Sequence, residues 1–82
     1  MKIAVEISMY PLSAEYLPAI QSFIDRLKAN GSLDVLVNTM STQILGEADE
    51  VFATLQREIT ASFESGPRAV FVTKFLGPAA LP

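Results

Sequence analysis

The sequence predicts an α+β fold in which two helices cover one face of a four-stranded antiparallel sheet. Three observations support this prediction. The first residues alternate between apolar and polar side chains, which is typical of a strand. Two longer segments place apolar residues at helical spacing. Short β-rich runs lie between and after these segments, so strands and helices alternate along the 82 residues.

The first strand is predicted from Lys2 to Tyr10. Its side chains fall into two alternating sets, Ile3, Val5, Ile7 and Met9 on one side and Ala4, Glu6, Ser8 and Tyr10 on the other. Period-two alternation with β-branched residues indicates a strand with one buried face. We expect the aliphatic set to meet the helices and the other set to face away. Pro11 has no N–H to donate and is expected to end the pairing.

The first helix is predicted between about Ser13 and Asn30. Its apolar positions have helical spacing, and they are Leu17, Ile20, Phe23, Ile24 and Leu27. Asn30 and Gly31 form a stop signal, because glycine takes a left-handed conformation at no steric cost. The start stays open, since Pro18 would lie just past a first turn capped by Ser13. Either the helix begins nearer Tyr16 or its first turn is irregular.

Two β-rich runs follow in tandem, from Asp34 to Met40 and from Ser41 to Gly46. No Asn-Gly or Asp-Gly turn separates them. We expect a hairpin connection somewhere between Asn38 and Ser41, although a bulge or a single bent strand fits the residues equally well.

A second helix is expected to open within Gly46 to Glu50, where acidic side chains favour a helix N-terminus. Its predicted apolar stripe comprises Phe52, Leu55, Ile59 and Phe63, with Val51. The Phe and Leu residues of both helices are expected to be core. Gly66-Pro67 ends the helix. The last strand is expected from Arg68 to Phe75, and composition does not separate its two faces. The tail from Gly77 to Pro82 is too short and proline-rich to add an element.

This order of elements is the split βαβ, or ferredoxin-like, arrangement. Right-handed crossovers put both helices on one face of the sheet. We therefore expect one ferredoxin-like domain over residues 1–82, with apolar side chains left on an open sheet face. Such a face usually indicates an interface or a ligand site.

Composition narrows the possible functions. Half of the residues are hydrophobic, and six Lys and Arg against nine Asp and Glu give a net charge of −3. An acidic chain of this size argues against nucleic acid and anionic membranes as partners. Cysteine and histidine are both absent, so thiolate sites and the usual general base are excluded. We therefore expect no catalytic residues, no metal site, no cofactor and no enzyme activity.

The N-terminal run also bears on location. Glu6 interrupts the first apolar stretch, which a signal peptide would not allow. No apolar stretch approaches the ~18–20 residues that span a bilayer. We expect no membrane insertion and a cytoplasmic location.

Two groups of polar residues are candidates for a ligand site. Glu6, Ser8 and Tyr10 share one strand face and offer a carboxylate, a hydroxyl and an aromatic ring. The alternative is a solvated face or the polar fringe of a dimer interface. The second group, around Met40, has small polar side chains that can bind a heteroaromatic ring, and it contains Asn38, Thr39, Ser41 and Thr42. Its alternative is ordinary turn chemistry.

The strand end from Ile7 to Leu12, and the run from Met40 to Gly46 with the following Asp49 to Phe52, form two motifs that resemble those of the YkoF-like thiamine/hydroxymethylpyrimidine-binding domains. The first motif reads ISMYPL. The second reads MSTQILG and is followed by an acidic pair and an aromatic residue in DEVF. The related small thiamine-binding proteins share this second motif.

The resemblance implies a ferredoxin-like domain that binds thiamine or its pyrimidine half without chemistry, as a carrier, sensor or transport accessory. It also implies a homodimer or homotetramer assembled through sheet faces. By position it favours as ligand-binding residues Tyr10, Ser41 and Thr42, with Asn38 and Thr39 nearby. Glu6 and Ser8 are added from the strand face and not from the family.

The chemistry of the implied ligand suits these residues. Thiamine is cationic, and a carboxylate such as Glu6 would pair with the ring nitrogen and amine of its aminopyrimidine. The lack of a glycine-rich phosphate loop predicts a preference for the unphosphorylated vitamin or the bare pyrimidine. A competing hypothesis is a structural oligomerisation module whose sheet face is consumed by a partner chain. A small enzyme using Glu6 and Tyr10 as acid and base is disfavoured.

Overall fold

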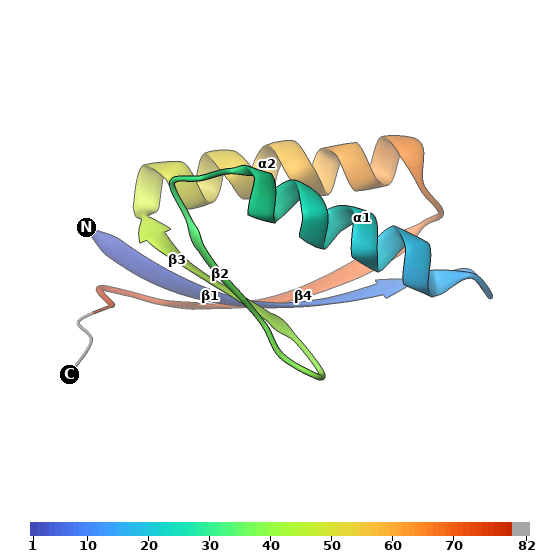
Figure 1. Cartoon of the computed structure of the whole chain (residues 1–82), viewed down its shortest axis with the longest axis horizontal. Coiled ribbons are helices and arrows are strands. Elements are labelled where there is room, and N and C mark those ends of the chain that lie inside the picture. The colour runs from blue at the N-terminus through green and yellow to red at the C-terminus, as the bar shows by residue number, and fades with distance from the viewer. Residues whose placement is uncertain (80–82) are drawn as a thin grey trace.

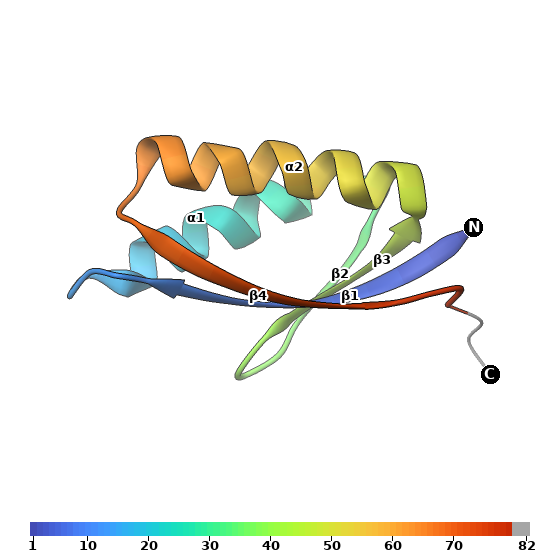
Figure 2. The same cartoon turned by 180° about the vertical axis from the view of Figure 1, so that it is seen from behind.

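A computed structural model describes residues 1–79 and has the predicted order of elements. These are β1 (Lys2–Pro11), α1 (Tyr16–Ala29), β2 (Asp34–Val37), β3 (Thr42–Glu47), α2 (Ala48–Ser65) and β4 (Ala69–Leu76). Both helices lie on one side of the sheet, and no helix among these residues covers the other side (Figures 1 and 2). The predicted ferredoxin-like α+β fold is confirmed. The end of the predicted irregular tail, 80–82, lies outside the described residues.

The sheet is antiparallel throughout, with the strand order β2-β3-β1-β4. β1 lies inside the sheet and pairs with β3 on one side and with β4 on the other. Glu6 in β1 is directly opposite Gln43 in β3 and Lys74 in β4. The central strand therefore brings side chains from three strands into one row.

The hydrophobic core lies between the sheet and the helices. The β1 side chains of Ile3, Val5 and Ile7 are buried there, as their alternation predicts. They pack with Phe23 and Leu27 of α1 in the same cluster. The intervening side chains of β1 consequently point to the open face of the sheet.

The structure decides which face of β4 meets the helices. The Phe71 ring lies 5.0 Å from the Phe23 ring and 5.6 Å from the Phe63 ring, between centroids. Val70 and Val72 are exposed on the other face. The open face therefore receives Val70, Val72 and Lys74, one of the two alternatives that composition left open.

The boundaries of the first helix and the hairpin follow one of the expected alternatives in each case. α1 begins at Tyr16, which keeps Pro18 within the first turn, where its missing N–H is tolerated. The hairpin closes between β2 and β3, with the Asn38 N–H donating to the Ser41 carbonyl at 2.8 Å. β2 ends at Val37, earlier than the predicted run to Met40.

The second helix begins at Ala48, within the predicted range from Gly46 to Glu50. Gly46 and Glu47 belong to β3, where they pair with Ile3 and Lys2 of β1. A Cβ atom on Gly46 would come within 2.5 Å of Leu33 Cδ2. Strand pairing therefore holds Gly46 in the sheet, where it lies close to Leu33. The helix opens only after Glu47.

The prediction that the Phe and Leu residues of both helices are core is wrong for three of them. Leu17, Phe52 and Phe63 are exposed by half or more. Phe52 instead stacks on Phe75 of β4, with ring centroids 5.3 Å apart. Phe63 likewise contacts Phe71 of β4, so both exposed aromatic residues of α2 lie over this edge strand.

A polar cluster joins the two helices. Arg26 of α1 donates from Nε to Glu58 Oε1 of α2 at 2.9 Å, and from Nη2 to Ser62 Oγ at 2.6 Å. Arg57 Nε also donates to Glu58, at 2.9 Å. The largely buried Glu58 carboxylate therefore has charged partners, as buried carboxylates require.

Leu27 should be a main contributor to the stability of this layer. Leu27→Ala is expected to lower the free energy of unfolding by about 2–5 kcal/mol, because it leaves a cavity at a side chain with 0% exposure. The matched control is Leu17→Ala on the same helix, where the side chain is 65% exposed and the expected change is within about 0.5 kcal/mol. Urea denaturation measures both. Equal losses would contradict this account of the core.

Candidate functional site

The open face of the sheet carries two neighbouring rows of side chains. One row is mostly polar and crosses the four strands as Leu36, Gln43, Glu6 and Lys74. The next row is mostly apolar and crosses them as Asp34, Leu45, Ala4 and Leu76. The face therefore places a carboxylate, an amide and an ammonium beside a hydrocarbon surface.

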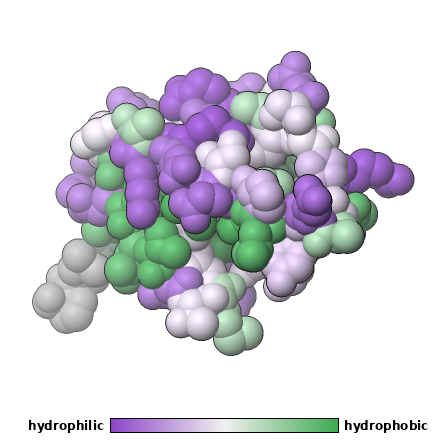
Figure 3. Space-filling model, turned by 45° about the vertical axis from the view of Figure 1, so that its right-hand side comes forward, coloured by the Kyte–Doolittle hydropathy of each residue, from purple (hydrophilic) through white to green (hydrophobic). Residues whose placement is uncertain are grey.

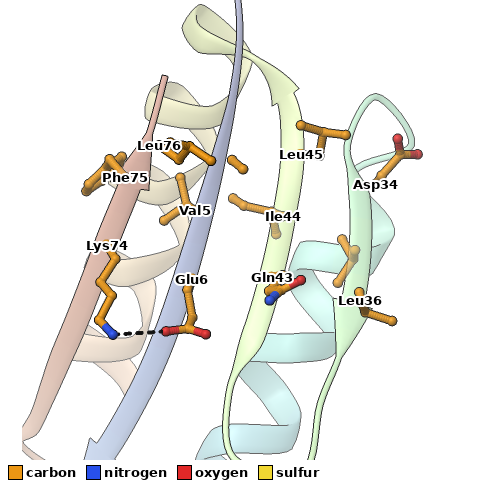
Figure 4. A pocket seen from close by; sticks show the side chains of 12 residues that line it. Val5, Glu6, Asp34, Leu36, Gln43, Ile44, Leu45, Lys74, Phe75 and Leu76 are labelled. Atoms are coloured by element: carbon orange, nitrogen blue, oxygen red, sulfur yellow. Dashed lines mark ion pairs between the residues drawn. The ribbon is translucent and has the colours of Figure 1, made fainter. Parts of the chain in front are cut away.

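A hollow of about 580 Å³ lies over these two rows. Ala4 is short and stands between the longer side chains of Leu45 and Leu76, so the surface is low along β1. Figure 4 shows the lining side chains, with Glu6 between Gln43 and Lys74. A volume in the range of about 300–1,000 Å³, mostly apolar walls and a few convergent polar groups are typical of small-molecule sites.

Apolar side chains are also exposed on the surface of the molecule around this hollow. Figure 3 shows apolar patches low on the molecule, beneath helices whose outer surface is largely hydrophilic. Exposed apolar side chains on β2, β1 and β4 include Leu36, Tyr10, Val70, Val72 and Leu76. Exposed apolar surface of this kind is typical of a ligand site or an interface.

Glu6 has two weak partners. Its Oε1 lies 3.6 Å from Lys74 Nζ, and its Oε2 accepts a hydrogen bond from Ser41 Oγ at 3.4 Å. The side chains are 39% exposed for Glu6 and 79% for Lys74. Exposed ion pairs of this kind contribute only ~0–1 kcal/mol. The carboxylate is therefore held in place loosely and stays accessible to a ligand that offers better donors.

A second, smaller hollow of about 140 Å³ lies between α1 and the β2–β3 hairpin. The structure brings five of the seven predicted site residues to it, namely Ser8, Asn38, Thr39, Ser41 and Thr42. Phe23 and Ile24 of α1 form its apolar side. The hydroxyl of Ser41 links this hollow to the larger one through its hydrogen bond to Glu6.

Not all predicted site residues face the same way. Thr42 is only 6% exposed, and its cross-strand partners in the sheet are Ile7 and Val37. Because Ile7 faces the helices, Thr42 does too, whereas its neighbour Ser41 reaches Glu6 on the open face. Tyr10 lies four residues beyond Glu6 on β1, about 13 Å away along the strand, and lines neither hollow.

Sequence reasoning missed several residues of the larger hollow. Gln43 and Leu45 alternate with Thr42 and Ile44 in β3, and this period-two signal would have placed them on the open face. The position of Lys74 opposite Glu6 depends on the β1–β4 register, which no local pattern reveals.

Residues 1–79 also bear on metal binding, on membrane crossing and on the role of the acidic residues in α2. They contain no group of three or more His, Cys, Asp or Glu side chains that could hold a metal ion. No helix in this part of the chain is long and apolar enough to cross a membrane. Asp49 and Glu50 lie in the first turn of α2, where they complement the helix dipole.

The fold leaves one face of the sheet uncovered, and the larger hollow on that face has the volume and lining of a small-molecule site. The sequence profile of the family described as "Thiamine-binding protein" matches residues 5–75. The chain therefore belongs to the thiamine-binding protein family. A search of curated proteins found no match.

Solved structures share the fold. A Thermotoga maritima protein with a proposed role in thiamine biosynthesis or salvage has a TM-score of 0.81 at 18% identity, over 92% of this chain and 82% of that one. A Streptococcus pneumoniae protein has a TM-score of 0.85 at 20% identity, over 96% and 90%. A hypothetical protein from Methanocaldococcus jannaschii has a TM-score of 0.82 at 23% identity, over 99% and 84%.

The opposite orientations of Ser41 and Thr42 have a measurable consequence. Thr42→Ala should lower the free energy of unfolding by about 1–3 kcal/mol, because it removes buried atoms from the helix-facing side. Ser41→Ala should change it by no more than about 0.5 kcal/mol, because the lost hydrogen bond is long and partly exposed. Thermal or urea unfolding measures both. A larger loss for Ser41→Ala would show that the two side chains are assigned to the wrong faces.

Proposed function

We propose that this protein binds thiamine or its hydroxymethylpyrimidine half in the larger hollow of the open sheet face and carries out no chemistry on it. Membership of the thiamine-binding family supports the ligand class. The hollow supplies a place for it that is reached from solvent. A role as carrier, sensor or transport accessory and a cytoplasmic location stay predictions within this proposal.

The observation that carries the proposal is the setting of Glu6. Its carboxylate lies beside the Gln43 amide and next to the row that contains Ala4, Leu45 and Leu76. An aminopyrimidine presents an amine donor and ring nitrogens along one edge and two apolar faces. The edge suits the carboxylate and the amide, and the faces suit the leucine side chains. Charge-assisted hydrogen bonds to the carboxylate would fix the orientation of the ring.

The same setting favours an unphosphorylated ligand. Of the residues that line the hollow, Glu6 and Asp34 are negative and Lys74 alone is positive. A phosphate group would meet more negative than positive charge there. Thiamine is cationic, so the excess of negative charge in the hollow attracts it.

A second function, assembly, is favoured by the exposed apolar side chains around the hollow. Val70 and Val72 continue the open face beyond Lys74 along β4. Packing against a second copy, as a homodimer or homotetramer, would cover them. Sedimentation equilibrium distinguishes an oligomer from a monomer, and a monomer at all concentrations would exclude this function.

Glu6→Gln should weaken thiamine binding by about 10- to 100-fold. A charge-assisted hydrogen bond contributes about 1.5–3 kcal/mol, and the amide that replaces the carboxylate loses that charge. Calorimetric titration with thiamine measures the affinity. The matched control is Glu64→Gln, at an exposed position of α2, which should bind like the wild type. No binding by the wild type at millimolar ligand would refute the proposal.

Ala4→Leu tests the hollow by its shape. The larger side chain would fill the low point between Leu45 and Leu76, so binding of both thiamine and the pyrimidine should be lost while the fold persists. Ala53→Leu, at an exposed position of α2, is the matched control and should bind normally. Circular dichroism checks the fold of both variants. Unchanged binding by a folded Ala4→Leu protein would move the site away from this hollow.

A further inference from the structure

We propose that Lys74 is a built-in competitor of the ligand for Glu6 and that it sets the preference of the site between cationic and neutral ligands. The inference rests on the proposed function, because it concerns the same hollow. It concerns a residue that the sequence did not indicate. Lys74 pairs with the carboxylate and has to give up this contact when the amine of a ligand binds the same oxygen.

The geometry indicates that Lys74 competes with a ligand for Glu6 and does not serve to fix the Glu6 side chain in place. Lys74 stands directly opposite Glu6 in the β1–β4 register, and its Nζ atom lies 3.6 Å from Glu6 Oε1. Figure 4 shows the Lys74 side chain extending along the face to Glu6. The side chain is 79% exposed, so it has free space to turn into solvent. Because exposed pairs are weak, the ammonium is displaced easily by an amine that also has apolar contacts.

The charges around the hollow make this competition selective. Glu6, Asp34 and Lys74 are the charged residues that line it. A neutral pyrimidine has to displace the Lys74 ammonium from Glu6. Once bound, it carries no charge for that ammonium to repel. A cationic ligand has to displace it and then shares the hollow with a like charge, since the displaced ammonium stays within the reach of the lysine side chain. Like charges about 4.5–6 Å apart in water repel by an amount equivalent to about a three- to fivefold change in affinity.

A second feature agrees with this assignment. The other side of Glu6 faces Gln43 and Ser41, which carry no charge. Lys74 is therefore the one cation that the described residues place beside the carboxylate. Removing its charge should leave Glu6 with uncharged neighbours and no competitor.

The test compares Lys74→Met with the wild type. Methionine keeps an unbranched side chain and removes the charge. Calorimetric titrations use thiamine and hydroxymethylpyrimidine as probes, each at about 20 mM and about 300 mM salt. Lys28→Met, at an exposed position of α1 in the helix layer, is the matched control for the loss of one positive charge. Circular dichroism confirms that each variant is folded.

We expect Lys74→Met to bind thiamine about three- to fivefold more tightly at low salt, with a smaller gain for the neutral pyrimidine. The difference between the two ligands should shrink at high salt, because salt screens exposed charges. Unchanged or weaker thiamine binding by Lys74→Met, while the wild type binds, would overturn the inference and leave the proposed function standing. An equal gain for both ligands would overturn the selectivity. Failure of the wild type to bind either probe would refute the proposed function and the inference with it.

Discussion

The alternation of side chains along β1 is the constraint on which the rest of the structure depends. Ile3, Val5 and Ile7 are buried beneath the helices. Because side chains alternate along a strand, the residues between them point to the opposite face. Glu6 is one of those residues. A shift of one residue in the register of β1 would bury Glu6 under the helices and expose the aliphatic set. The stability of the core and the position of the candidate site are thus two consequences of the same pattern.

Much of the fold could be predicted because its signals are local. The period of two in β1, the helical spacing around Phe23 and the end of α1 just before Asn30 are each signalled within a few residues, although Gly31 does not take the expected left-handed conformation. The sequence places the start of α2 only within Gly46 to Glu50, because the pairing of Gly46 and Glu47 with Ile3 and Lys2 decides where the strand ends. That pairing joins residues more than 40 positions apart, and no local rule contains it.

The site could be predicted only in part for the same physical reason. Glu6 was found because its strand has one clearly aliphatic face. Lys74 was not found, because both faces of β4 are apolar and only the contacts of Phe71 with the helical aromatic residues decide which face is open. Ser41 and Thr42 were grouped as a pair of hydroxyls, yet neighbouring residues of a strand point to opposite faces. A site built across strands requires the register, which is a property of the whole sheet.

The proposed ligand binding and the proposed assembly on this face would influence each other. A second sheet packed over the hollow would remove Glu6 and Lys74 from water, and a buried ion pair recovers its desolvation cost only with good geometry. The 3.6 Å separation between these groups is loose, so burying this pair under a second sheet would be unfavourable. An amine that binds Glu6 closely, with its ring against the leucines, replaces the loose pair by a well-satisfied carboxylate. Binding would then favour closure of a partner over the hollow, and by linkage closure would tighten binding.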